Sequence, residues 1–524
     1  MKHVIWQRAT VMAVAENAKL PASRLARPPV VSQIRCVKRQ LLTKTRNSKT
    51  KKIAKREMRP KGRFSMYGDI MIHAYKLNDY NIVLDVNSGS IHLVDEVAFE
   101  AICLLEHGTE EAAQEYLRAK FDELTKSDIS ELFDSIAGLR DSGKLYAGDT
   151  YAGTPPLGEA PPLKALCLNV AHACNMRCSY CFAGRGEYGG DEGLMSLEIG
   201  KRAVDFLLKN SHGRRNLDID FFGGEPLLNW EVVKGTVAYA RSKERENGKN
   251  FRFTLTTNGV LIDDEVIEFS CKEMHNVVLS LDGRPEINDK HRVLPGGGGS
   301  YGLVLPKFRE LVDARQGKGY YIRGTFTSEN KDFVNDILHI ASCGFEEISL
   351  EPAVAKPEEP LGFNKEDLAE LFEQYEVLAK EMIERSKAGG GFKFYHFNLS
   401  LDAGPCVHKR IAGCGVGTEY MAVTPGGKLY PCHQFVGDES FVIGDVHEGI
   451  TNAELLKQFG KWDIYSRPSC KDCWAKFYCS GGCAANAYHD TGDISGVYEI
   501  GCELFKKRLE CAIMIQVAVM PTQP

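Results

Sequence analysis

ALCLNVAHACNMRCSYCF, residues 165–182, joins a run of apolar residues to a tight group of cysteines. Residues 165–170 are almost continuously apolar, which is typical of a strand buried on both faces of a parallel sheet. Cys174, Cys178 and Cys181 follow this run directly. Active sites of α/β barrels form in the loops after the strands, so we expect these thiols at the functional end of the first strand.

The spacing of the three thiols, C-x3-C-x2-C, suits an iron–sulfur cluster. A [4Fe–4S] cluster takes four protein ligands, and only three are present locally, which leaves one iron open for an external ligand. Two other interpretations remain open. The thiols could lie buried along one stripe of a helix, or they could form a zinc site with a remote fourth ligand.

Strand and helix patterns alternate from residue 164 to about residue 388. Strands are expected at Ala165–Val170, Leu217–Phe222, Arg252–Thr256, Asn276–Leu281, Tyr320–Thr327 and Glu347–Glu351. Helices are expected at Leu197–Lys209, Trp230–Glu246, Asp264–Met274, Phe333–Cys343 and Glu366–Lys387. Six such units with apolar strands predict an α/β fold, a partial (β/α)6 barrel whose parallel sheet is covered by outer helices.

The cysteine segment resembles the signature of the radical S-adenosylmethionine (SAM) superfamily. The resemblance implies that the open iron binds SAM and that reductive cleavage gives a 5′-deoxyadenosyl radical. Gly223-Gly224-Glu225-Pro226 looks like the family motif that contacts the SAM amino group, and Asn258 and Ser280 look like family positions that face SAM. Arg323 could pair with the SAM carboxylate. Ordinary turns, or a structural ion pair for Arg323, are the alternatives.

A second group of cysteines lies towards the end of the chain. It consists of Cys414, Cys432, Cys470, Cys473, Cys479, Cys483 and Cys502. This spacing resembles the SPASM domain, which accompanies radical SAM enzymes that modify peptides and proteins. The resemblance implies two auxiliary [4Fe–4S] clusters, and therefore three clusters with the SAM-binding one. The first would use Cys414, Cys432 and Cys483, and the second the remaining four. A pair of structural zinc knots is the alternative.

Two residues near the first auxiliary cluster have open roles. Cys406 could be its fourth ligand, which we expect, or one iron could stay open for a substrate thiolate. His433 follows Cys432, at the place where anaerobic sulfatase-maturing enzymes use an Asp as a general base. The imidazole could take a proton or hydrogen-bond to cluster sulfur.

Residues 71–150 predict a small α/β domain. The expected elements are strands at Tyr80–Val86 and Ser90–Val94 and helices at Val97–Glu106, Glu110–Phe121 and Ile129–Ser142, the last capped by Asp128. This segment resembles the recognition element of ribosomally made, post-translationally modified peptides (RiPPs), a winged-helix domain that binds a precursor's leader as an added strand. A DNA-binding winged helix is the alternative, which the lack of a strongly basic face disfavours.

Three stretches narrow the resemblance to the thioether-forming SCIFF peptide maturases: YNIVLDVNSG at 80–89, NLDIDFFGGEP at 216–226 and YPCHQFV at 430–436. The resemblance covers roughly residues 71–511. It implies a cysteine-rich precursor peptide whose cysteine sulfur is joined to a carbon of an acceptor residue, and a low-potential electron donor such as a flavodoxin or ferredoxin. The alternatives are a Cα thioether, a carbon–carbon cross-link, an epimerisation, a sulfatase-type formylglycine or, remotely, a zinc-knot module that binds nucleic acid.

Charge is unevenly distributed along the chain. Residues 1–65 hold 18 Lys or Arg and two acids, a net charge of +16 that leaves −21 for the remainder of a chain whose total is −5. We expect 1–65 to be a disordered extension. It could be translated upstream of a true start at Met66 or Met71, a basic tail that contacts nucleic acid, or an organelle transit peptide. The acidic remainder disfavours general nucleic-acid binding.

The 17 cysteines are odd in number and clustered, which indicates metal ligation in a reducing compartment and not disulfides. No apolar run approaches the ~20 residues that cross a bilayer, so we expect a cytoplasmic enzyme without a membrane partner. Four scattered thiols, Cys103, Cys167, Cys271 and Cys343, are expected in the core. The expected domains are the extension 1–65, the peptide-recognition domain 66–150, a linker 151–163, the barrel 164–395 and the SPASM domain 396–524.

Overall fold

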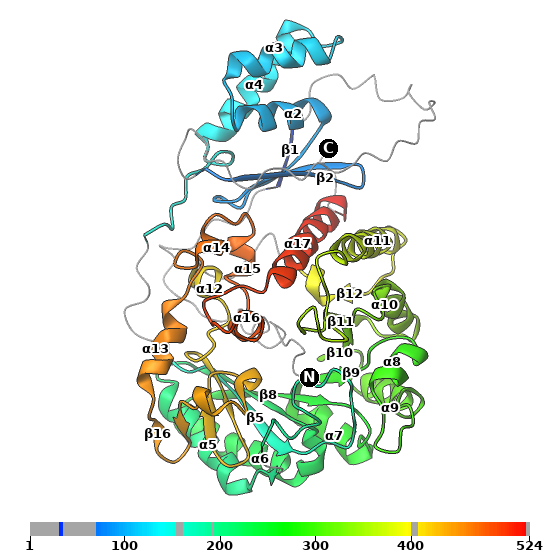
Figure 1. The fold of residues 1–524 in the computed structure, drawn as a ribbon, viewed down its shortest axis with the longest axis vertical. Helices are drawn as coiled ribbons and strands as arrows, with labels where there is room; N and C mark the ends of the chain where they lie inside the picture. The colour runs from blue at the N-terminus through cyan, green and yellow to red at the C-terminus, as the bar shows by residue number, and fades with distance from the viewer. Residues whose placement is uncertain (1–30, 35–69, 154–160, 191–192, 400–406, 520–524) are drawn as a thin grey trace.

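The computed structural model describes residues 31–34, 70–153, 161–190, 193–399 and 407–519. An N-terminal domain lies at one end of the molecule and an α/β barrel at the other (Figure 1). Between them lies the cysteine-rich C-terminal region, drawn in orange and red.

The barrel is built on parallel strands that lie side by side in chain order. They are β5 (Ala165–His172), β7 (Asn216–Gly223), β8 (Asn250–Thr257), β9 (Met274–Ser280), β10 (Tyr320–Phe326) and β11 (Glu347–Pro352). The short strands β6 (Gly193–Leu194) and β12 (Lys393–Phe394) pair with β5 and β11. Every residue of β5 is buried, as its apolar run predicts, and every residue of β10 is buried although that strand contains Arg323. The six expected strands are confirmed, with ends that differ by a few residues.

Helices cover the outside of this sheet. They are α5 (Leu197–Asn210), α6 (Trp230–Asn247), α7 (Asp264–Glu273), α8 (Pro285–His291), α9 (Tyr301–Ala314), α10 (Phe333–Ser342) and α11 (Leu368–Lys387), with the 3-10 turn η3 (Pro226–Asn229) after β7. The sequence did not predict α8 and α9. Pro306 lies inside α9, where it removes a backbone donor and argues against a helix locally. Burial of Val304, Phe308 and Leu311 outweighs that cost.

The sheet continues from the barrel into the C-terminal region. Strand β13 (Tyr420–Val423) pairs in parallel with β5, and β14 (Lys428–Tyr430), β15 (Gly444–Asp445) and β16 (Gly449–Ile450) follow as an antiparallel ladder. Short helices fill the rest of this region: η4 (Tyr395–Phe397), α12 (Val407–Ala412), η5 (His433–Phe435), η6 (Glu439–Phe441), α13 (Ala453–Lys461), α14 (Pro468–Lys471), α15 (Lys476–Cys479) and α16 (Ala484–Thr491). The first barrel strand therefore has neighbours on both sides.

A long helix, α17 (Glu499–Val519), packs along α11. The sequence did not predict it, because its apolar residues 511–515 occupy consecutive positions and leave no helical stripe to recognise. The packing explains this pattern, since residues 511–515 are all buried. Across the described ranges, no helix is long and apolar enough to cross a membrane.

The N-terminal domain packs three helices against a sheet whose strands β2 (Ile72–Leu77), β3 (Tyr80–Asp85) and β4 (Ile91–Val94) are antiparallel. The helices are α2 (Glu96–Leu105), α3 (Glu110–Lys120) and α4 (Lys126–Asp141). The sequence did not predict strand β2. A two-residue turn joins it to β3, and the turn residues Asn78 and Asp79 adopt φ angles of 43° and 47°. The expected cap of α4 is corrected: Thr125 is the N-cap, and Asp128 completes a capping box.

The expectation of disorder throughout residues 1–65 is also corrected. Strand β1 (Val31–Ile34) pairs in parallel with β4, with Val31 opposite Ile91 and Ile34 opposite Val94. The sheet order is β1-β4-β3-β2, so β1 occupies the edge of the N-terminal sheet beyond β4. The rest of the extension lies outside the described residues.

The N-terminal domain is docked on the cysteine-rich region. The His73 ring stacks on Trp474 at a centroid distance of 3.6 Å, and its Nε2 lies 3.0 Å from Glu510 Oε1. Lys476 forms a buried ion pair with Asp149 at 3.0 Å. Trp474 follows Cys473 directly in the chain, so this contact reaches the loop that carries a predicted cluster ligand.

Candidate active site

A pocket lies at the carboxyl ends of the barrel strands. It is lined by Cys174, Met176, Cys178, Tyr180, Cys181, Phe182, Ala183, Phe222, Gly223, Gly224, Glu225, Thr256, Thr257, Asn258, Ser280, Arg292, Arg323 and Thr325. The structure therefore brings together the three thiols of the first loop and the residues expected to contact SAM. Pro226 is the exception, since it is buried at the start of η3 and does not line the pocket.

Gly223, the last residue of β7, and Gly224 after it allow that strand to turn against the cysteine loop. Gly223 has a φ of +132°, and a Cβ atom on it would lie 2.3 Å from the carbonyl oxygen of Ala171. A Cβ atom on Gly224 would lie 2.1 Å from the carbonyl oxygen of Ala173. Both positions require glycine for packing within the protein, in addition to any approach to a ligand.

Glu225 is buried at the base of the pocket and ties two loops together. Its carboxylate accepts hydrogen bonds from Thr257 Oγ1 at 2.8 Å, the Asn258 backbone N–H at 2.8 Å and the Leu227 backbone N–H at 3.0 Å. Burial raises the pKa of Glu225 to about 7, although these hydrogen bonds favour the charged form. Three of the roughly four lone-pair sites of the carboxylate are thus used, and one on Oε2 is left for an ammonium group in the pocket.

Asn258 orients the cysteine loop. Its Nδ2 donates to Asn175 Oδ1 at 2.8 Å and lies 3.8 Å from Cys174 Sγ. Ser280 and Arg323 face each other across β9 and β10, and Arg323 donates to Ser349 Oγ at 3.2 Å. All three residues thus have structural contacts in addition to lining the pocket.

A largely buried hydrogen-bond network that the sequence did not predict acts electrostatically on Cys178. Tyr180 donates to Asp282 Oδ2 at 2.5 Å and accepts from Arg292 Nη1 at 2.9 Å. Burial raises the pKa of Cys178 to about 11, and the Arg292 cation opposes that rise. Asp282 could have been found from its strand-end position, but no local pattern distinguishes Arg292, which only the fold brings to the pocket.

The C-terminal thiols form two electrostatic groups. Burial raises the pKa of Cys432, and Cys483 and Cys414 raise it further. We call these three thiols the first auxiliary set. Burial raises the pKa of Cys502 to about 12, and Cys479, Cys470 and Cys473 add to it. These four thiols are the second auxiliary set. Cys406 lies outside the described residues.

The donor chemistry of these sets fits iron–sulfur clusters. Thiolates are the ligands that such clusters use, and raised pKa values mean that protons must leave when metal binds. Among the described His, Cys, Asp and Glu side chains, no three converge as the ligands of one metal ion would.

His433 lies between the first auxiliary set and the pocket. Its Nδ1 is 3.0 Å from the Tyr420 hydroxyl, and its ring packs near Phe222 and Phe182, which line the pocket. Burial and the Arg323 cation lower the pKa of His433 to about 3. The imidazole is therefore neutral at physiological pH and a weak proton acceptor.

The scattered thiols differ in their surroundings. Cys167 is buried as expected, and Cys103 packs at the edge of the N-terminal core. Cys271 is exposed on α7, so its expected place in the core is wrong. Cys343 is partly buried, with its sulfur 3.6 Å from the Tyr301 hydroxyl.

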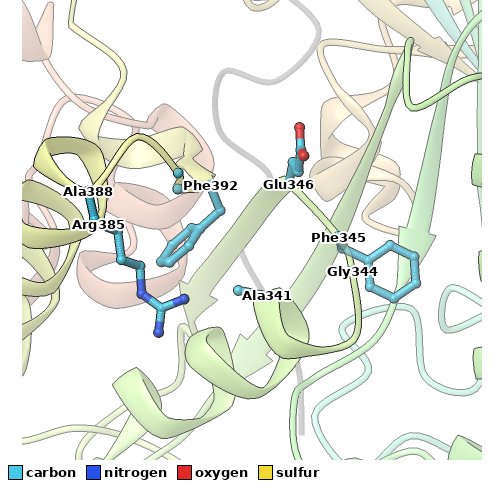
Figure 2. A pocket seen from close by; sticks show the side chains of 9 residues that line it. Ala341, Gly344, Phe345, Glu346, Arg385, Ala388 and Phe392 are labelled. Atoms are coloured by element: carbon cyan, nitrogen blue, oxygen red, sulfur yellow. The ribbon is translucent and has the colours of Figure 1, made fainter.

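A second hollow, of about 340 Å³, lies at the opposite end of the strands (Figure 2). Glu346 and Phe392, which precede β11 and β12, line it together with Arg385 of α11. This is the amino-terminal end of the parallel sheet, away from the cysteine loop. It therefore takes no part in the candidate active site.

Two family models match the chain. The radical SAM superfamily model matches residues 168–339, and the SPASM model, an iron–sulfur cluster-binding domain, matches residues 414–474. These segments contain the cysteine loop after β5 and the start of the C-terminal cysteine region. The chain thus carries a radical SAM domain followed by a SPASM domain.

Similar proteins include the radical SAM cyclopropyl synthase TigE of Paramaledivibacter caminithermalis, 23% identical over 66% of this chain and 72% of that protein. A cysteine-type anaerobic sulfatase-maturating enzyme of Clostridium perfringens strain 13 / Type A is 26% identical over 62% of this chain and 89% of that enzyme. The solved structure of native anSMEcpe with bound AdoMet and Kp18Cys peptide covers 68% of this chain and 99% of that one, with a TM-score of 0.55 and 23% identity. The last match shows a shared fold.

Proposed function

We propose that this radical SAM enzyme with a SPASM domain installs thioether cross-links in a ribosomally made, cysteine-rich precursor peptide of the SCIFF type. The observation that carries the proposal is the arrangement of ten described cysteines, three in the barrel pocket and seven in the two auxiliary sets. Similarity to anaerobic sulfatase-maturating enzymes, and a shared fold with anSMEcpe, which was solved with a bound peptide, support a peptide or protein substrate. The SCIFF assignment rests on the sequence stretches at 80–89, 216–226 and 430–436.

Within the barrel, Cys174, Cys178 and Cys181 would hold a SAM-binding [4Fe–4S] cluster. When bound, this cluster and SAM supply a 5′-deoxyadenosyl radical that removes a hydrogen atom from the acceptor residue. Glu225 would accept a hydrogen bond from the SAM ammonium, and Arg323 would offer its guanidinium to the SAM carboxylate. The Arg292 cation, which donates to Tyr180, would favour the thiolate form of Cys178 that a cluster requires.

The first auxiliary set provides a site for the substrate sulfur. Its three described thiols leave one ligand position of a [4Fe–4S] cluster, which either Cys406 or a substrate cysteine fills. A thiolate held there is deprotonated and oriented. His433 and Phe222 lie between this set and the barrel pocket, so the sulfur and the acceptor carbon would meet near these side chains.

The number of clusters gives the first test. After anaerobic reconstitution, we expect about twelve iron and about twelve acid-labile sulfide per chain, since each [4Fe–4S] cluster holds four of each. About four of each would restrict the enzyme to the SAM-binding cluster. Bound zinc without iron would instead support the zinc-knot alternative.

Mass spectrometry of the precursor peptide tests the reaction itself. Incubation with SAM and a low-potential reductant such as reduced flavodoxin should remove two hydrogen atoms, about 2 Da, per cross-link. The modified cysteines should also resist thiol alkylation. A sulfatase peptide serves as the comparison substrate, since sulfatase-maturating enzymes are among the relatives. Turnover of that peptide alone would replace the thioether proposal with formylglycine formation.

The N-terminal domain would bind the precursor's leader as an added strand. Main-chain groups at a sheet edge give such a strand its affinity. Strand β1 already occupies the edge beyond β4, so a leader that uses this edge must displace it. When a tethered segment occupies the edge, the apparent dissociation constant of the leader is the intrinsic constant divided by the fraction of molecules whose edge is unoccupied.

A variant that begins at Met66 should therefore bind the leader at least about threefold more tightly than the full chain, if β1 occupies its edge two-thirds of the time or more. Fluorescence anisotropy with a labelled leader peptide measures this change. Because the deletion also removes basic charge, the full-length double variant Ser32→Pro, Gln33→Pro is the matched control, and we expect the same direction. Unchanged or weaker leader binding by both variants would contradict competition at the β4 edge.

A further inference from the structure

Arg467 is a buried cation held mainly by neutral groups. Only 6% of its surface is exposed, and its guanidinium donates to the carbonyl oxygens of Gly496 at 2.7 Å and Ile494 at 2.9 Å. Within the described ranges, no carboxylate lies at ion-pair distance from it. A buried charge is costly unless an anion compensates it. Its surroundings therefore call for a negative group.

The position of Arg467 indicates which negative groups these are. Its Nε and Cδ each lie 3.7 Å from where a Cβ atom on Gly481 would be, and Gly481 lies between Cys479 and Cys483 in the chain. The backbone carbonyl of Arg467 accepts a hydrogen bond from the N–H of Cys470 at 3.0 Å. The side chain is thus packed against the turn that links the two auxiliary sets.

The electrostatic contacts of Arg467 agree with this placement. Burial lowers its pKa, and the thiols of Cys470, Cys483 and Cys479 act in the opposite direction, together with Asp493. Cys483 belongs to the first auxiliary set, whereas Cys470 and Cys479 belong to the second. One guanidinium therefore acts on ligands of both sets.

Other cations near these thiols are placed differently. Lys506 acts on Cys473 and Cys502, both in the second set, and pairs with Glu503 at 2.7 Å. Arg508 lies near Cys479 but pairs with Glu351 at 3.1 Å. Each of these charges has a carboxylate partner, which Arg467 does not have among the described residues.

We propose that Arg467 raises the reduction potentials of both auxiliary clusters and so makes each a better electron acceptor. This inference rests on the proposed function, which gives the enzyme those clusters. Reduction adds one electron and one negative charge to a cluster, and no bond forms or breaks. The guanidinium stays protonated, so no proton accompanies the electron. A fixed cation in a low-dielectric site stabilises the more negative, reduced state.

The effect of Arg467 on the auxiliary clusters matters because thioether formation releases one electron that a cluster must accept. Joining a thiol to a C–H carbon removes two electrons and two protons, and the 5′-deoxyadenosyl radical takes one of each as a hydrogen atom. The thiol proton goes to solvent, and the remaining electron must be accepted near the new bond. A shared cation makes that transfer more favourable at either auxiliary site.

The test is an EPR-monitored redox titration of the anaerobically reconstituted full-length enzyme. In Arg467→Gln, the equilibrium constant for one-electron reduction should fall about tenfold or more at both auxiliary clusters, or about 59 mV in potential. The SAM-binding cluster should keep its wild-type potential. Arg467→Lys should restore most of the shift, and Lys506→Gln should shift only one auxiliary cluster. Unchanged auxiliary potentials in Arg467→Gln with full iron content would overturn the inference.

A second variant keeps the test decisive if Arg467→Gln loses iron. Asp493 is an exposed anion near Arg467, and Asp493→Asn should raise both auxiliary potentials. If Arg467→Gln loses iron, an upward shift of both auxiliary potentials in Asp493→Asn supports the inference, and wild-type potentials in Asp493→Asn overturn it. Shifted potentials without thioether formation would leave the inference standing and remove the proposed reaction. Thioether formation with unshifted potentials would support the proposed reaction and overturn the role of Arg467. Absence of both auxiliary clusters would overturn the proposed reaction and the role of Arg467 together.

Discussion

Replacement of Cys174 with alanine is expected to abolish cleavage of SAM. Cys174 lies in the pocket after β5 with Cys178, Cys181 and Glu225, and a three-thiol site that loses one ligand cannot hold a cluster with a single open iron. We expect 5′-deoxyadenosine formation to fall by at least about 10³-fold, to the rate without enzyme. Liquid chromatography of anaerobic reactions with dithionite and SAM measures this product.

The matched control for that experiment is Cys271→Ala. Cys271 is exposed on α7, away from the pocket, so its loss should leave SAM cleavage unchanged. It also controls for the removal of one thiol during reconstitution. A Cys174→Ala enzyme that forms 5′-deoxyadenosine at the wild-type rate would refute the assignment of the barrel pocket.

Replacement of Cys432 with alanine should separate SAM cleavage from peptide modification. Cys432 is buried in the first auxiliary set, and the barrel pocket does not include it. We expect iron to fall by about four per chain, 5′-deoxyadenosine still to form, and the thioether product to fall at least about 10²-fold. Parallel iron assays, nucleoside chromatography and peptide mass spectrometry give the three readings.

Cys343→Ala is a suitable control, since Cys343 is a partly buried thiol on the barrel exterior. It should retain its iron and all of its product. Full cross-linking by Cys432→Ala with about eight iron per chain would show that the first auxiliary set is dispensable. Loss of 5′-deoxyadenosine as well would show that this set supports the barrel site.

The barrel strands could be predicted from the sequence because their pattern is local. A strand such as β5 is buried at every position, and its sequence is an almost continuous apolar run. The elements that were missed depend on tertiary contacts. Strand β2 alternates weakly because His73 and Tyr75 bind α17, and α17 itself is buried on too many sides to show an amphipathic pattern.

The residues of the candidate active site also divide into those with a local sequence signal and those that depend on tertiary contacts. Cysteine spacing and the Gly-Gly-Glu-Pro motif are local in sequence, so they identified the thiols and Glu225. Arg292 and Arg467 had no such signal, because each depends on chain segments that only the fold brings together. The glycines show a further limit: the sequence suggested approach to a ligand, whereas the structure adds a close approach of Gly224 to Ala173.

The docking of the N-terminal domain on α17 has a consequence for synthesis of the protein. His73 contacts Glu510, which is 437 residues later in the chain, and at about 5–20 residues per second the ribosome needs roughly 20–90 s to reach it. Strand β5 likewise waits for β13, from Ala165 to Tyr420. The N-terminal domain can fold early, but its docking on α17 and the pairing of β5 with β13 come late in translation. Nascent chains therefore pass through a long interval in which an unpaired strand edge and free thiols are accessible to chaperones and to the iron–sulfur assembly machinery.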